Sequence, residues 1–409
     1  MTASGTVRTS LDDSPSLPDG WRWAEVRDLC RSIDYGFTAS ADFKLKEPRF
    51  LRITDIQNSR VEWTDVPGCR IGAKDEAANS LADGDVVFAR SGATSGKSFL
   101  VQNPPRSVFA SYLIRLRVGQ HISPQYLWSF FQSEAYWQQI RDSSRGGAQP
   151  NVNATLLGKI RVPLPPYSEQ RRIVDILDEQ MAAIDRARAA AQARLDAAQA
   201  LPAAFLLAIF DSAEMQRWPL QPLGKVLRLR KDVVHPHDNP KGAATFVGLE
   251  HIETLTGKRT GMLDVEMSTL TGRKPRFFKG DIVYGYLRPY LNKLWIAEFD
   301  GLCSVDQYVY EVDSSVNDSR FVAYFMRSPI YLQRAPIDTT PGQLPRIRTE
   351  EVASVEINLP DYDTQKHIAD LIDSKMEDAA RLRRTLEHQA SAINALPSAL
   401  LRRAFTGGL

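Results

Sequence analysis

The sequence has little that would mark a secreted, metal-binding or membrane protein. Its 409 residues include only three cysteines, Cys30, Cys69 and Cys303. That odd number fits neither a disulfide framework nor the spacing of metal ligands, and it predicts reduced thiols in a cytoplasmic protein. The longest apolar run, 203–210, is far shorter than the ~20 residues of a membrane span. The chain opens with polar residues and not with an apolar signal segment, so we expect no membrane partner.

The sequence also has almost no excess of charge of either sign. Lys and Arg number 51 against 49 Asp and Glu, a formal net charge of +2. Charge alone therefore does not indicate nucleic acid, because a basic domain would show a clear excess of Lys and Arg. The hydrophobic share of 43% and the charged share of 24% are those of an ordinary globular protein. The length allows two or more domains, each with its own core.

The sequence does contain an internal repeat, whose two copies lie about 195 positions apart. The motif Leu-Pro-x-Tyr-x-x-Gln-x-x-Ile-x-Asp at 164–175 returns at 359–370, and Ala-Leu-Pro-x-Ala at 200–204 returns at 395–399. A duplicated chain can meet a linear target twice. Double-stranded DNA is the natural target that presents two related sites at a fixed spacing.

Each copy has the same order of parts. A long region of short apolar runs, broken by Gly, Pro, Asn and Asp, predicts strands and turns. An Ala- and Arg-rich helix of about 33 residues follows, roughly 50 Å long; we expect it to stop at Leu-Pro, before a short apolar segment. Apolar residues recur along both helices in steps of four and three, which favours a coiled coil. The chosen positions of this seam are Leu177, Met181, Ile184 and Leu195 in copy one, and Ile372, Met376, Leu386 and Ile393 in copy two.

The predicted fold class is α+β, with two β-rich domains joined by two long helices that pair as an antiparallel coiled coil with pseudo-twofold symmetry. The alternative is that each helix lies on its own domain. Antiparallel pairing would place the two domains at opposite ends of the helices, so that the helices act as a ruler between two half-sites. The expected segments are an N-terminal tail at 1–16, domains at 17–160 and 215–355, and helical segments at 161–214 and 356–409.

Together these features resemble the specificity subunit of type I restriction-modification systems. The resemblance covers nearly the whole chain and includes Leu-Pro-x-Gly-Trp at 17–21 and Gly-Gly-Ala-Gln-Pro-Asn-Val at 146–152. The second copy departs from the latter motif, with Thr-Pro-Gly-Gln-Leu-Pro-Arg-Ile at 340–347. Roles carried over from the family are therefore better founded in copy one.

The resemblance implies a DNA reader without catalytic activity. Each target recognition domain would read half of a bipartite, asymmetric DNA target, and the helices would form the spacer and dock two methyltransferase subunits. Endonuclease and translocase subunits join the larger complex in this family. The methyltransferase partners bind S-adenosylmethionine and flip out the adenine that they modify. The resemblance thus implies no cofactor, no metal and no catalytic residue in this chain.

The loops that differ between the copies hold the candidate DNA contacts. Arg and Lys suit guanine, Asn and Gln suit adenine, and Lys, Arg, Ser and Thr suit phosphates. The candidates in copy one are Arg90, Ser91, Thr94, Lys97, Ser111, Tyr112, Arg145 and Gln149. Those in copy two are Tyr286, Arg288, Tyr290, Asn292, Lys293, Gln307, Tyr308 and Arg346.

Alternative functions remain open from the residues alone. The chain could serve a type IIB-like system, in which one partner both cleaves and methylates. Ser91–Ser98 differs by one residue from a phosphate-binding P-loop, which would make the chain an NTP-using enzyme if a helix followed it. A coiled-coil adaptor without nucleic acid is a third possibility. His235 and His237 could form half of a metal site, but no carboxylate or Cys stands near at ligand spacing.

Overall fold

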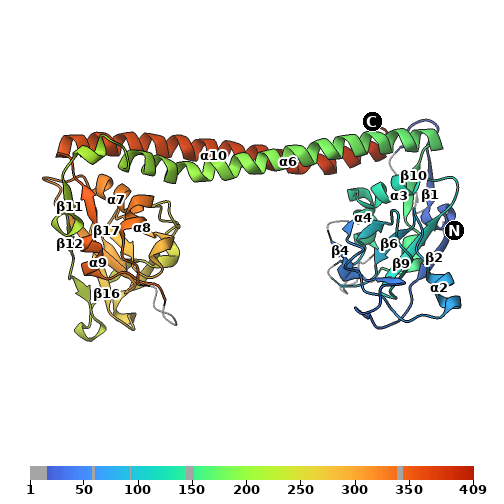
Figure 1. Ribbon diagram of the computed structural model, residues 1–409, viewed down its shortest axis with the longest axis horizontal. Coiled ribbons are helices and arrows are strands. Elements are labelled where there is room, and N and C mark those ends of the chain that lie inside the picture. The colour runs from blue at the N-terminus through green and yellow to red at the C-terminus, as the bar shows by residue number, and fades with distance from the viewer. Residues whose placement is uncertain (1–15, 58–59, 93, 144–151, 339–343) are drawn as a thin grey trace, which may run out of the picture. The chain divides into compact units, whose positions relative to one another are not determined.

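The computed structural model describes residues 16–57, 60–92, 94–143, 152–338 and 344–409. The chain divides into two compact units. Unit 1 combines residues 1–190 with 390–409, and unit 2 comprises residues 191–389. Each unit contains a β-rich domain, the first part of one long helix and the last part of the other (Figure 1).

Unit 1 is built on a four-stranded antiparallel sheet in the order β2-β9-β6-β7. Three further pairs accompany it: β1 with β10 and β4 with β5, both antiparallel, and β3 with β8, parallel. The strands are β1 Arg22–Glu25, β2 Cys30–Tyr35, β3 Arg49–Leu51, β4 Ile56–Gln57, β5 Arg60–Val61, β6 Val86–Ala89, β7 Ser98–Leu100, β8 Ser107–Phe109, β9 Leu113–Val118 and β10 Arg161–Leu164. The short helices are α1 Val26–Leu29, α2 Ala73–Asn79, α3 Pro124–Phe131, α4 Glu134–Asp142 and α5 Ala154–Gly158.

Unit 2 repeats this topology, with a four-stranded sheet in the corresponding order β12-β20-β17-β18. The parallel pair β14–β19, which corresponds to β3–β8, is part of a five-stranded sheet in the order β13-β16-β19-β14-β15. The strands are β11 Leu220–Pro222, β12 Leu227–Leu229, β13 Val233–Val234, β14 Ala243–Val247, β15 Leu263–Glu266, β16 Lys274–Phe277, β17 Ile282–Gly285, β18 Leu294–Ile296, β19 Gly301–Cys303, β20 Gln307–Val312 and β21 Glu356–Asn358. The short helices are α7 Ser319–Arg327, α8 Pro329–Arg334 and α9 Thr349–Ser354.

Short 3-10 helices fill several connections in both units. They are η1 Ile53–Asp55, η2 Met215–Arg217, η3 Leu223–Lys225, η4 Pro236–Asp238, η5 Leu249–His251, η6 Met267–Thr269 and η7 Pro289–Leu291. The shared strand order confirms the internal repeat at the level of the fold.

The most buried strand of each sheet, β6 or β17, follows the same Gly-Asp turn. All four residues of each of these strands are buried. The aspartate of the turn is buried too, and its carboxylate accepts a backbone hydrogen bond three residues earlier: Asp85 from Ala82 and Asp281 from Phe278, at 2.9 and 2.7 Å. Because a buried carboxylate needs a counter-charge, each also pairs with an arginine, Arg117 or Arg230.

The two long helices are α6 Tyr167–Phe210 and α10 Tyr362–Phe405. Both continue through Pro202 and Pro397, so the expectation that they stop at Leu-Pro is wrong. A proline inside a helix forfeits one backbone hydrogen bond and strains the preceding turn. The apolar residues beyond it offset that cost, because they are buried in the cores of the domains.

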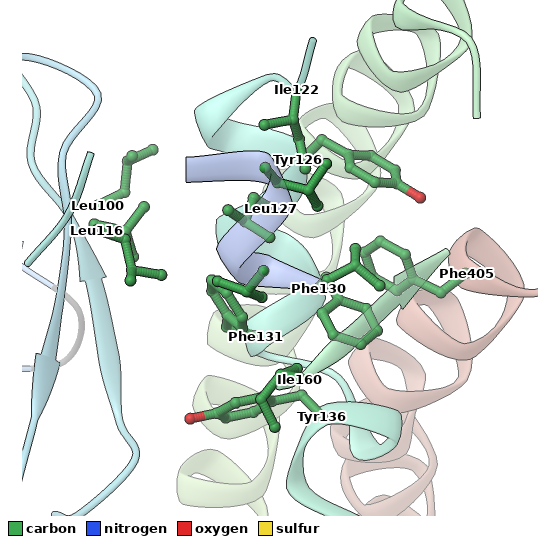
Figure 2. Packing of buried hydrophobic residues seen from close by; sticks show 14 of the residues in the cluster. Leu100, Leu116, Ile122, Tyr126, Leu127, Phe130, Phe131, Tyr136, Ile160 and Phe405 are labelled. Atoms are coloured by element: carbon green, nitrogen blue, oxygen red, sulfur yellow. The ribbon is translucent and has the colours of Figure 1, made fainter. Parts of the chain in front are cut away.

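Unit 1 shows this burial directly, because the end of α10 completes its core (Figure 2). The Phe405 ring lies 5.3 Å from the rings of both Tyr126 and Phe130, which project from α3. Leu400 and Leu401 join the same cluster, together with Ile173 and Leu177 from the start of α6. The core of unit 1 is therefore made from both ends of the chain.

Unit 2 uses the same arrangement with the helices exchanged. Phe210, at the end of α6, lies 5.4 Å from Phe321 and 5.5 Å from Phe325, both on α7. The start of α10 contributes Ala369 and Ile372 to this core. In each unit, the start of one long helix thus packs beside the end of the other, which confirms the antiparallel pairing.

The predicted seam positions lie on the inward side of the helices. Leu177, Ile184 and Ile372 are buried, whereas Met181, Leu195, Met376, Leu386 and Ile393 are half-buried. Arg188 and Arg383, which fall at seam positions by the same steps of four and three, are also half-buried. Arg188 donates a 3.3 Å hydrogen bond to the carbonyl of Asn394 on the other helix, also within unit 1.

A buried glutamine joins each domain to its long helix. Gln170 accepts a 2.8 Å hydrogen bond from the Ser123 amide and donates to the carbonyls of His121 and Pro165, at 3.1 and 3.0 Å. Gln365 repeats this in unit 2, accepting from the Asp318 amide at 3.0 Å and donating to the Pro360 carbonyl at 2.8 Å. The repeated Gln of the sequence motif therefore fixes the angle between domain and helix inside each unit.

The Ala-rich stretch of α6 gives the chain more hydropathy than its longest apolar run indicates. Within residues 167–217, one window of helix reaches a mean hydropathy of 1.4, so by length and composition this helix could cross a membrane. Only 17% of that window is buried. Helices of soluble proteins can pass the same test, and many small Ala side chains raise mean hydropathy without forming a wide apolar face.

Candidate nucleic-acid interface

Arg90 follows β6, and three hydrogen bonds hold its backbone. Its amide donates to the Tyr112 carbonyl at 3.0 Å, and its carbonyl accepts from the Val152 amide and the Ser95 hydroxyl at 3.1 and 3.0 Å. Its guanidinium lies 5.0 Å from the centre of the Tyr35 ring, a cation–π arrangement. The backbone of Arg90 is thus held in place, and its guanidinium packs against the face of the Tyr35 ring.

Sequence reasoning missed Tyr35, the last residue of β2. Its hydroxyl accepts a 3.1 Å hydrogen bond from the Ala154 amide, and 43% of the residue is exposed. The next residue, Gly36, passes so close to a neighbouring loop that an added Cβ would lie 2.3 Å from the Ala110 carbonyl oxygen. A Tyr-Gly pair at the end of a strand was the available signal, because such a glycine marks a close approach of backbone.

The other candidates in unit 1 lie mostly on the surface around Arg90. Tyr112, Ser91 and Lys97 are exposed, and Tyr112 leaves 66% of its surface accessible. Thr94 and Ser111 are half-buried. Arg145 and Gln149 lie outside the described residues.

The segment Ser91–Ser98 is the turn of a hairpin and not a P-loop. It joins β6 to β7, which pair antiparallel with Val86 opposite Leu100. A P-loop needs a helix directly after it, because the helix N-terminus helps to bind phosphate. A strand stands in that place, so the NTP-binding alternative is wrong.

Unit 2 places Tyr286 where unit 1 has Arg90. Tyr286 follows β17 and stacks on Tyr308, with ring centres 4.4 Å apart and planes 20° from parallel. Burial raises the pKa of Tyr308 to about 12. Burial and nearby Asp306 raise the pKa of Tyr286, while Arg346 and Arg273 act in the opposite direction. Both phenols are therefore neutral near pH 7 and keep their hydroxyl protons.

Arg288 and Tyr290 form the exposed rim beside this pair. Arg288 has a positive φ of 51° and its amide donates to the Pro345 carbonyl at 2.7 Å. Half of the Tyr290 surface is accessible, at 50%. Arg346 forms β-bridges with Leu287 and Asp338, so the segment after the gap in the described residues lies beside the loop that carries Arg288.

Three candidate DNA contacts in unit 2 instead form hydrogen bonds within the domain. Asn292 is fully buried, and its amide donates to the Met326 carbonyl at 2.8 Å. Gln307 is buried, and its side chain accepts from the Ser304 amide at 2.9 Å, closing the turn before β20. Lys293 is half-buried, and its ammonium donates to the Leu249 carbonyl at 2.7 Å. Asn292 and Gln307 are thus inaccessible to a duplex, and Lys293 is engaged within the domain.

Each unit therefore presents aromatic and basic side chains beside the end of its most buried strand. Within the described ranges, no three His, Cys, Asp or Glu residues gather as metal ligands. His235 and His237 lie 4.9 Å apart, ring to ring. Arginine forks, tyrosine rings and hydroxyls are the groups that contact bases and phosphates.

Comparison with known proteins agrees with this geometry. The family profile "Type I restriction modification DNA specificity domain" matches residues 18–191. The type I restriction enzyme EcoDI specificity subunit of Escherichia coli is 25% identical over 67% of this chain and 69% of its own length. The StySPI specificity subunit of Salmonella potsdam is 22% identical over 96% of this chain and 90% of its own. Residues 18–191 thus match the type I specificity domain, and the chain is similar to type I specificity subunits over most of its length.

Solved structures with a similar fold cover nearly the whole length of this chain. The HsdS subunit from Thermoanaerobacter tengcongensis matches with a TM-score of 0.66 at 19% identity, covering 97% of this chain and 99% of its own. A chain from a study of assembly and conformational transition of the type I R-M system matches at 0.73 and 20% identity, covering 97% and 100%.

Proposed function

We propose that the two β-rich domains of this specificity subunit read the two halves of a bipartite, asymmetric DNA target. The observation that carries the proposal is the repeat: both units share one strand order, but they present different side chains after the corresponding strands β6 and β17. A shared scaffold with different surface side chains suits recognition of two different sequences.

The long helices act as the spacer between the half-sites. Support comes from their unbroken length of 44 residues each and from the antiparallel packing seen inside each unit. The helices also dock two methyltransferase subunits, and endonuclease and translocase subunits complete the assembly. Much of the α6 surface is left for such partners, since 17% of its most apolar window is buried. S-adenosylmethionine binds to the methyltransferases, and the complex works in the cytoplasm.

Mapping methylated adenines in a host that carries the complete system tests the proposal. We expect two short motifs separated by a constant number of unspecified base pairs. A type I system methylates through separate methyltransferase subunits, whereas a type IIB system would use a partner that also cleaves. A single continuous motif, or no sequence preference, would contradict the proposal. Absence of any DNA binding would favour an adaptor role.

Lengthening the helices tests the spacer role. Seven residues are inserted into α6 between Ala190 and Ala191, and seven into α10 between Gln389 and Ala390. A heptad keeps the seam in register and adds about 10 Å, roughly three base pairs of duplex. We expect a spacer longer by about three base pairs, with both half-site sequences unchanged. A heptad inserted in one helix alone is the control, and it should abolish binding. Retention of the original spacer by the double insertion would refute the ruler.

A further inference from the structure

Arg90 and Tyr286 occupy the same backbone position in the two units. Each follows the most buried strand of its sheet and donates its amide to the carbonyl just before the neighbouring strand of that sheet, Arg90 to Tyr112 before β9 and Tyr286 to Asp306 before β20. Each carbonyl accepts from the segment before the last short helix, from Val152 at 3.1 Å or Ile347 at 3.2 Å. The backbone at this position is therefore held by equivalent hydrogen bonds in both units, and only the side chain differs.

We propose that this position determines base specificity, and that Arg90 reads a guanine in the half-site of unit 1. The inference rests on the proposed function and adds the residue and the base. Arg90 can offer two parallel N–H donors to the O6 and N7 atoms of guanine. Tyr286 has no such fork, so unit 2 does not read a guanine in this way; its ring suits apolar contact, such as with a thymine methyl group.

The surroundings of Arg90 leave its hydrogen-bonding edge available. Within the part of the chain that the structure describes, no ion pair or side-chain hydrogen bond engages its guanidinium, which rests on Tyr35. Arg115 and Arg117, on the adjacent strand β9, are instead bound to Asp34 and Asp85. Stacking limits the rotation of the guanidinium, and a pre-organised fork loses less entropy when it binds.

The test is selection of preferred sequences from a pool of randomised duplexes by the full chain assembled with its methyltransferase subunits. Arg90→Ala should lose the preference for one guanine, by about 5- to 150-fold, while the other half-site keeps its sequence. Arg90→Lys should restore only part of the preference, because an ammonium cannot form the fork. Unchanged base preference in Arg90→Ala would overturn the inference.

Two controls separate base reading from other effects. Lys97→Ala removes an exposed cation from the adjoining hairpin and should weaken binding to all sequences alike, with a smaller salt dependence. Tyr35→Leu removes the supporting ring, and we expect a partial loss of discrimination at the same guanine only. Thermal unfolding of each variant checks that unit 1 is intact. Loss of preference at several bases in Tyr35→Leu would instead indicate a general structural role.

Transfer of the arginine gives the sharpest outcome. Tyr286→Arg places a guanidinium beside Tyr308, the ring on which Tyr286 stacks. We expect a new guanine preference in the half-site of unit 2, at the place that corresponds to the first. If neither Arg90→Ala nor Tyr286→Arg changes base preference, the role of this position in base specificity is rejected, but the proposed function is not. A wild-type complex that selects no bipartite sequence rejects the proposed function itself.

Discussion

In unit 2, Arg320 on α7 ties the domain to α10 through Asp370 and Asp373, at 2.8 and 2.7 Å, and it also pairs with Asp318. Tyr324 donates a hydrogen bond to Asp373 as well. Unit 1 has the same two aspartates on its own helix, but Gln125 stands where unit 2 has Arg320.

The corresponding aspartates of unit 1 are Asp175 and Asp178. Burial and the neighbouring Asp175 raise the pKa of Asp178. The aromatic core and the buried glutamine are the same in both units, whereas the charges at the joint are not. The apolar contacts and the glutamine therefore define how domain and helix meet, and the charged residues only adjust the strength of that joint.

The largest expected effect tests the shared aromatic core. Phe405→Ala should destabilise unit 1, and Phe210→Ala unit 2, each by about 3–5 kcal/mol, because a large buried ring leaves a cavity. Hydrogen exchange resolved by segment measures where protection falls. Loss of protection mainly in the opposite unit would contradict the assignment of each ring to its core.

Removing the buried glutamine should have a smaller and equal effect in both units. Gln170→Leu and Gln365→Leu each leave a buried backbone amide without an acceptor, a cost of about 1–3 kcal/mol. Denaturant unfolding of the two variants measures the difference. Glu179→Gln, an exposed change on α6, is the control and should be neutral. Markedly unequal losses would show that the joints are not equivalent.

Exchanging the residues that differ at the joint should make the stability of each unit more like that of the other. Arg320→Gln should destabilise unit 2 by about 1 kcal/mol, a modest value because solvent screens the pairs. Gln125→Arg should stabilise unit 1 slightly and lower the pKa of Asp178 by supplying a cation. NMR titration of the aspartate side chains and thermal unfolding check both outcomes. A destabilising Gln125→Arg would mean that geometry, and not charge, separates the joints.

The smallest effect depends on pH and concerns Asp34. Burial raises its pKa, but hydrogen bonds from Ser32 and Arg115 outweigh that, so the pKa is lowered overall. A lowered pKa stabilises the fold above the ordinary value near 4, and this contribution is lost as pH falls below it. The melting temperature of Asp34→Asn should thus lie below that of the wild type at pH 7, with a gap that closes below about pH 4. Unit 2 has Val309 in place of Arg115, so its stability should not follow this change. A gap that persists at low pH would contradict the ion pair.

The repeat, the fold class and the helix seam could be predicted from the sequence because they depend on spacing. Apolar residues at steps of four and three face one side of a helix whatever surrounds them. The ends of the helices could not be predicted in this way. Pro202 and Pro397 are local stop signals, and only the burial of Phe210 and Phe405 against distant helices shows why each helix continues.

The candidate site was only partly predictable for a similar reason. Loop position identified the exposed Tyr112 and the half-buried Arg90 and Tyr286, but it did not separate them from the buried Asn292. The side-chain amide of Asn292 is bound to the Met326 carbonyl within the domain. Tyr35 lies far from Arg90 in sequence, and no local pattern joins the two. Which side chains meet across strands is decided by register, and sequence spacing alone does not fix the register between distant strands.

Because Phe405 belongs to the core of unit 1, the order of synthesis matters. A ribosome releases the first domain long before it makes the helix end that completes it, whereas residues 191–389 emerge together. Unit 2 can therefore fold first, while the core of unit 1 lacks Phe405 until residues 390–409 have been translated. A nascent chain that stops at residue 389 would lack the part of the unit 1 core that α10 supplies.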